Sequence, residues 1–152
     1  MKKILIGTHN IGKFKEISSL LPKKLKKISP QSLQIKSPRE TGKTFIANAQ
    51  LKANYFFSYC NFPVISDDSG LCIKALQGKP GIYSARWSKK YGGFKNAMKL
   101  ILKKMKKKSN RSAHFISCLS YKSKKNKMTT VTGKVYGEIS QKIVGSNGFG
   151  YD

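Results

Sequence analysis

The sequence predicts an α/β fold with a mixed central β-sheet flanked by helices, and three observations support this. Short apolar runs at 3–7 and 63–66 are typical of buried strands. Apolar residues recur at helical spacing in 14–21, 45–57 and 94–105. Segments 113–121 and 129–136 flank a lysine-rich turn and favour an antiparallel hairpin.

The length of 152 residues favours one domain that is large enough to bury a core. The net charge of +25 points to a polyanionic partner or to a biased composition. Lysine outnumbers arginine 28 to 3, and the lysines are spread along the chain. Proteins that clamp phosphates or read bases favour arginine, so biased composition is the better explanation and specific nucleic-acid binding is not expected.

The cysteines and the N-terminus indicate the compartment. Three widely spaced cysteines, no C-x-x-C pair and two histidines make a structural zinc site improbable. The first apolar run, Ile4–Ile6, is too short for a signal peptide, and no run approaches the length of a membrane span. A cytoplasmic protein without a membrane partner is therefore expected.

The chain opens as a strand, a polar turn and a helix, the arrangement in which α/β proteins bind phosphate on backbone N–H groups. The spacing Gly7-x4-Gly12-Lys13 resembles a P-loop, but Phe14 stands where that motif needs Ser or Thr. The turn remains either a phosphate-binding loop or an ordinary βα turn. Pro22 should end the helix, whose apolar face is Phe14, Ile17, Leu20 and Leu21.

The second helix follows a stretch in which Leu33 and Ile35 suggest a short strand. Thr44 is the expected N-cap, and Asn48 and Lys52 share one side of the helix. Glu40 precedes the helix. It either interacts favourably with the helix dipole or serves as a metal ligand near the acids at 67 and 68.

Asp67 and Asp68 lie side by side in a very basic chain and are expected to leave the end of the strand 63–66. Adjacent carboxylates repel each other, so their presence suggests a positive partner. A divalent metal with a polyphosphate would explain both the acids here and the bases elsewhere.

Four ordered motifs resemble those of the inosine/xanthosine triphosphate pyrophosphatase family. They are THNIGK near the N-terminus, ETGKTFIANAQLKA, DDSGLCIKALQGKPGIYSAR and GFGYD. The resemblance implies a two-lobed fold with the active site in the cleft. It implies hydrolysis of non-canonical purine nucleoside triphosphates (ITP, dITP and XTP) to the monophosphate and pyrophosphate, with Mg2+ as cofactor and a homodimer as the usual assembly.

The resemblance also implies roles for individual residues. Glu40 and Asp68 would bind the metal, and Asp68 would be the general base. Lys52 would reach a phosphate and Ser69 would contact substrate. Asp67 would support this site, and Arg86 is a weaker candidate for a phosphate or dimer contact. The remaining substrate contacts would be Thr8, His9, Asn10, Ile11, Gly12 and Lys13 on the triphosphate, and Phe149, Gly150, Tyr151 and Asp152 at the base.

In the family the last motif is followed by a segment with a substrate-binding Lys, a Ser-His-Arg motif and a closing helix. The resemblance therefore predicts that residues 1–152 form one domain that is incomplete at its C-terminus. Two alternatives to the enzyme stay open: a non-catalytic polyanion or nucleic-acid binder, motivated by the charge, and an inactive fragment of the enzyme.

Overall fold

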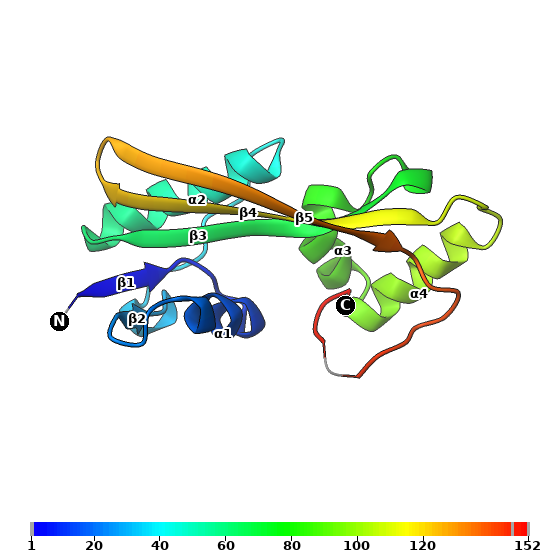
Figure 1. Cartoon of the computed structure of the whole chain (residues 1–152), viewed down its shortest axis with the longest axis horizontal. Helices are drawn as coiled ribbons and strands as arrows, with labels where there is room; N and C mark the ends of the chain where they lie inside the picture. Colours follow the sequence, from blue (N-terminus) through cyan, green and yellow to red (C-terminus); the bar gives the residue numbers. More distant parts are fainter. Residues whose placement is uncertain (1, 147, 152) are drawn as a thin grey trace. The chain divides into compact units, whose positions relative to one another are not determined.

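A computed structural model describes residues 2–146 and 148–151 (Figure 1). Its longer elements alternate between strands and helices up to the third strand, and two consecutive helices and two consecutive strands then follow. The strands are β1 (Lys3–Ile6), β2 (Lys26–Ile28), β3 (Val64–Ile73), β4 (Ser112–Lys124) and β5 (Lys127–Glu138). The helices are α1 (Ile11–Leu20), α2 (Phe45–Cys60), α3 (Ser84–Lys90) and α4 (Phe94–Met105), with short 3-10 turns at Gln31–Leu33, Lys74–Leu76 and Gly81–Tyr83.

The five strands form one sheet in the order β2-β1-β3-β4-β5. β1 pairs in parallel with both β2 and β3, with Leu5 opposite Ile28 on one side and Val64 on the other. Two residues connect β4 to β5, a length that joins antiparallel strands. The predicted mixed sheet flanked by helices is confirmed.

The internal contacts divide the chain into two compact units. The first unit contains the chain up to Asp68 together with Cys118–Thr132, and the second contains Ser69–Ser117 and the chain from Gly133 onward. Each unit has its own apolar core. The core of the first is built on Leu5, Ile35, Phe56 and Val64, and that of the second on Leu71, Ile73, Ile101, Met105 and Ala113.

In the first unit, α1 ends where the sequence predicts, but it begins at Ile11, within the segment predicted to be a polar turn. The side chain of Asn10 caps its first turn, and Pro22 follows its last residues. Ile17 is buried, but Leu20 is 79% exposed, so the predicted apolar face is wrong at Leu20. The strand suggested at 33–35 is also wrong, because the second strand lies earlier, at Lys26–Ile28, beside β1.

Helix α2 begins at the predicted cap, where Thr44 Oγ1 accepts a hydrogen bond from the Ala47 N–H at 3.0 Å. Its buried residues include Ala49 and Phe56 at the expected spacing. Asn48 and Lys52 are buried on this helix as well. Polar side chains that are buried need polar partners, so this burial marks α2 as an element of the functional site.

The predicted position of the acidic pair, at the end of a strand, is wrong. Asp67 and Asp68 do not follow the end of a strand, because β3 continues without a break from Val64 to Ile73. Successive side chains of a strand point to opposite faces. The two carboxylates are therefore directed toward different neighbours rather than sharing one turn.

In the second unit, α4 carries its predicted apolar face, with Ala97, Ile101 and Met105 buried. The predicted hairpin is present as β4 and β5. Near the end of the described chain, the Tyr151 hydroxyl donates to the Ser84 carbonyl at 2.9 Å, and burial raises the pKa of this phenol to about 12. No helix in the described part of the chain has the length and apolar character needed to cross a membrane.

Candidate active site

The turn after β1 is tightly packed. Gly7 is buried, and a Cβ built on it would lie 2.2 Å from Ser66 Oγ and 2.6 Å from Phe56 Cδ2. A side chain at this position would collide with both neighbours, so only glycine allows the end of β1 to approach α2 and β3 this closely.

The polar turn that follows is organised by its own hydrogen bonds. Thr8 Oγ1 accepts from the Asn10 N–H at 3.2 Å, and Asn10 Oδ1 accepts from the Lys13 N–H at 3.1 Å. The second bond makes Asn10 the N-cap of α1, so Ile11 and Gly12 are the first residues of the helix. The turn therefore presents the positive end of a helix dipole, a setting that favours anions.

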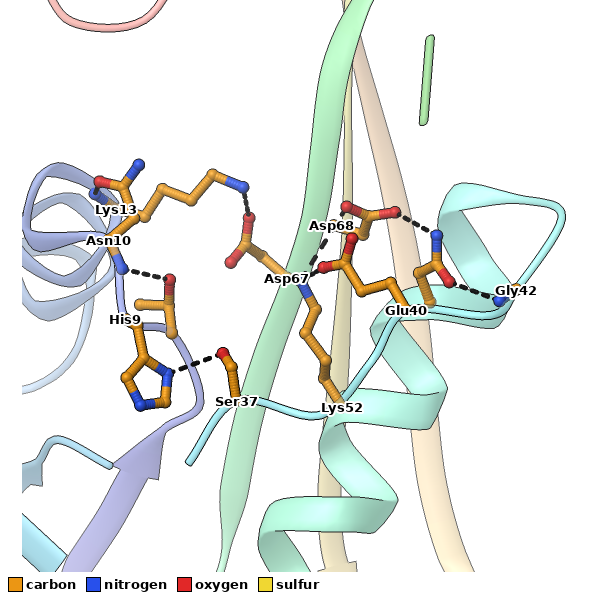
Figure 2. Close-up of polar contacts among 11 residues, drawn as sticks. His9, Asn10, Lys13, Ser37, Glu40, Gly42, Lys52, Asp67 and Asp68 are labelled. Atoms are coloured by element: carbon orange, nitrogen blue, oxygen red, sulfur yellow. Dashed lines mark hydrogen bonds and ion pairs between the residues drawn. The ribbon is translucent and has the colours of Figure 1, made fainter. Parts of the chain in front are cut away.

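His9 ties this turn to the segment before α2 (Figure 2). Its Nε2 lies 3.0 Å from the Ile35 carbonyl and its Nδ1 lies 2.9 Å from Ser37 Oγ. A carbonyl can only accept, so Nε2 carries a proton and donates. Both ring nitrogens are engaged in holding two loops together.

Asp67 faces the turn. Its Oδ2 lies 2.5 Å from the Nζ of Lys13, and the carboxylate side chain is 4% exposed. Figure 2 shows the Asp67 and Asp68 side chains leaving opposite sides of the β3 ribbon, as expected for neighbours in a strand. The pair is thus divided, with Asp67 directed toward α1.

Asp68 is directed toward α2. Its Oδ2 accepts from Asn48 Nδ2 at 3.0 Å, and its Oδ1 lies 3.9 Å from Lys52 Nζ. Burial raises the pKa of Asp68 to about 6; Lys52 and the Asn48 hydrogen bond oppose this rise, and Glu40 adds to it. At neutral pH this carboxylate is therefore ionised, yet it is more basic than an exposed aspartate.

Glu40 reaches the same ammonium group, with Oε1 at 2.8 Å from Lys52 Nζ. Burial alone would lower the pKa of Lys52, but the carboxylates of Asp67, Glu40 and Asp68 outweigh it and raise that pKa above 10.5. Lys52 is therefore charged and lies between two carboxylates that come from separate segments.

The carboxylates of Glu40 and Asp68 fit a magnesium ion that would also be coordinated by phosphate oxygens of the substrate. Among the described residues, no three His, Cys, Asp or Glu side chains come together as a ready-made metal site. Glu40 and Asp68 nevertheless converge on one cation, the ammonium of Lys52. Mg2+ is commonly held by one or two carboxylates with substrate phosphates and water completing the shell, so two converging carboxylates are sufficient.

The first unit thus brings together most of the residues predicted for the phosphate and metal side: Lys13, Glu40, Lys52 and Asp68 with Thr8, His9 and Asn10 on the adjoining turn. The other predicted contacts belong to the second unit. Ser69 follows Asp68 in β3, Phe149 is 41% exposed, and Gly150 and Tyr151 follow it. Arg86 is exposed and lies over the Tyr83 ring, and Asp152 lies outside the described residues.

Sequence reasoning missed two features of this site. Asn48 was placed beside Lys52 on one side of α2 but was given no role, although it contacts Asp68. The signal was an asparagine within the apolar period of a helix, where a buried amide needs partners. The pairing of Lys13 with Asp67 was not predicted, because it joins residues 54 positions apart.

The sequence is also similar to that of a known protein family. Residues 4–152 match the model of the Ham1 family. The chain is 41% identical over 157 residues to a dITP/XTP pyrophosphatase of Legionella pneumophila, covering 100% of this chain and 80% of the relative. It is 36% identical over 154 residues to a dITP/XTP pyrophosphatase of Zymomonas mobilis, covering 99% of this chain and 74% of the relative.

The fold of this chain also resembles those of solved structures. A HAM1 protein from Coxiella burnetii superposes with a TM-score of 0.90 at 32% identity, covering 100% of this chain and 80% of that one. The Staphylococcus aureus Ham1 protein gives 0.87 at 35% identity, covering 99% and 79%. The sequence match over nearly the whole chain and the shared fold lead to one conclusion: the chain belongs to the Ham1 family.

Proposed function

We propose that this chain hydrolyses non-canonical purine nucleoside triphosphates of the dITP and XTP type to the monophosphate and pyrophosphate. One observation carries the proposal: two carboxylates, Glu40 and Asp68, converge on Lys52 beside a capped helix N-terminus that carries Lys13. This set combines anion-binding groups with a basic carboxylate. The dITP/XTP pyrophosphatases named above support the substrate class.

In this proposal the triphosphate binds at the turn from Thr8 to Lys13. The N-terminal end of α1 and the Lys13 ammonium offset its negative charge. His9 acts on this step indirectly, because its ring holds the turn against Ile35 and Ser37. Lys52, whose side chain is 11% exposed and whose ammonium contacts Glu40, supplies a second positive charge.

Hydrolysis requires a base that accepts a proton from the attacking water. We assign this role to Asp68, a buried carboxylate whose pKa in the metal-free protein is raised to about 6 by burial. Glu40 and Asp68 would hold Mg2+, which when bound neutralises phosphate charge. Asn48 and Lys52 keep the Asp68 carboxylate oriented throughout.

Pyrophosphate release from dITP and XTP tests the proposal, with dGTP as the matched substrate and EDTA to remove divalent metal. We expect release that requires Mg2+, prefers dITP and XTP over dGTP, and is lost in Asp68→Asn. An active Asp68→Asn protein would refute the assigned base. A protein that releases no pyrophosphate from any of these nucleotides would refute the activity.

A homodimer and a cytoplasmic location are part of the same proposal. The homodimer follows from the family resemblance, and the location follows from the free thiols of Cys60, Cys72 and Cys118, which are typical of a reducing compartment. Light scattering of the purified protein and fractionation of cells that express it would test them. A monomer at micromolar concentration, or recovery in the membrane fraction, would contradict them.

A further inference from the structure

Asn48 joins two parts of the site through one side chain. It is completely buried in α2. Its Nδ2 donates to Asp68 Oδ2 at 3.0 Å, and its Oδ1 accepts from the backbone N–H of Gly42 at 2.8 Å (Figure 2). A carboxylate can only accept and a backbone N–H can only donate, so these two partners fix the orientation of the amide.

The first bond determines how Asp68 is used. Asn48 engages Oδ2, while Oδ1 is the oxygen directed toward Lys52. Without this bond the carboxylate would be free to rotate about its last torsion, which has broad minima. Asn48 therefore fixes the orientation of the Asp68 carboxylate, with the other oxygen facing Lys52.

The second bond fixes the segment that carries Glu40. Residues 34–44 belong to no helix or strand, so hydrogen bonds of other kinds must hold them. Gly42 lies two residues after Glu40, and a Cβ built on it would lie 2.5 Å from Asn48 Oδ1. Glycine at position 42 thus leaves the space that the Asn48 amide occupies.

We propose that Asn48 is a positioning residue that holds Asp68 and Glu40 in the arrangement required to bind the metal. Its effect on catalysis rests on the proposed function, but its effect on the Glu40 segment and on metal affinity does not. A side chain that orients metal-binding carboxylates in this way typically contributes about 10- to 100-fold in metal affinity or activity.

The unmodified protein supplies the first test, hydrogen exchange of the Gly42 amide. The bond to a buried side chain should protect this amide, although its segment has no secondary structure. Protection well above that of an open coil supports the bridge. Exchange at the rate of an unstructured peptide overturns it, whether or not the protein hydrolyses nucleotides.

The second test compares Asn48→Ala with Asn54→Ala, which removes an exposed asparagine from the same helix. Mn2+ titration without nucleotide gives metal affinity, and steady-state kinetics with dITP gives kcat and KM. For Asn48→Ala we expect Mn2+ affinity and kcat to fall by about 10- to 100-fold, with little change in the KM for nucleotide. Asn54→Ala should match the parent protein in all three.

The outcomes separate the two proposals. If the parent protein is active and Asn48→Ala binds Mn2+ and turns over normally, Asn48 has no positioning role and the proposed function stands. If no protein is active but Asn48→Ala loses Mn2+ affinity and Gly42 protection, the proposed function fails and the bridge stands. Equal losses in Asn54→Ala would reveal a general effect on α2 and overturn the role of Asn48.

Discussion

Asp68→Asn is expected to make the metal-free protein more stable at neutral pH while removing its activity. The side chain of Asp68 is 7% exposed, and its pKa rises from 3.8 to about 6. Keeping a buried carboxylate ionised therefore costs folding free energy that the neutral amide of asparagine does not. The replacement is nearly isosteric, so packing should change little.

The sign of the pH dependence follows from the raised pKa. Between about pH 4 and pH 6 the folded protein binds more protons at Asp68 than the unfolded chain does. The stability of the parent protein relative to Asp68→Asn is therefore lost as the pH rises through this window. A shift from 3.8 to about 6 corresponds to about 3 kcal/mol at pH 7.5, and to about 1 kcal/mol at pH 4.5.

Urea unfolding in EDTA at pH 4.5 and pH 7.5 measures this effect as the difference between the variant and the parent protein. Other carboxylates titrate in the same range, so the difference carries the information rather than either curve alone. Glu16→Gln, which removes a carboxylate from the exposed side of α1, is the matched control. A variant that is less stable than the parent at pH 7.5, or a difference that does not change with pH, would refute the reasoning.

Three further changes test the surroundings of the site by urea unfolding. Gly7→Ala should destabilise the protein by about 3 kcal/mol, because the new methyl group overlaps buried neighbours. The control is Ser66→Ala, which removes a hydroxyl that has no hydrogen-bond partner among the described residues and should be nearly neutral. Equal losses of stability in the two variants would contradict the steric explanation. Thr44→Ala should cost about 1 kcal/mol through the lost cap of α2, and no loss would contradict that role. Lys13→Ala should lower the free energy of unfolding by about 3 kcal/mol, because it leaves the Asp67 carboxylate buried without the Lys13 ammonium. Adding Asp67→Asn should recover part of this loss, and additive losses would show that the two side chains do not act together.

Much of the fold could be predicted because it depends on local sequence. Apolar periodicity predicts the buried residues of α4, and Thr44 predicts the start of α2. These signals lie within one turn or one strand, where the spacing of side chains is determined by backbone geometry.

The parts that could not be predicted depend on contacts between distant segments. Gly70, after two aspartates and a serine, is typical of a turn, yet β3 continues through it because it pairs within a sheet. Tertiary pairing can override local turn propensity in this way. For the same reason the role of Asn48 became visible only when Gly42 and Asp68 were seen on either side of it.

The local charge of the site differs from the charge of the chain, and this difference bears on the metal. The chain carries a net charge of +25. In the first unit, however, three carboxylates (Glu40, Asp67 and Asp68) face two ammonium groups (Lys13 and Lys52), which leaves one net negative charge when all are ionised. Exposed lysines farther away than about 8 Å are screened at physiological salt, so they offset little of this local negative charge. A divalent cation bound by Glu40 and Asp68 would offset this charge, and for that reason we assign the proposed metal to the local carboxylates rather than to the basic composition.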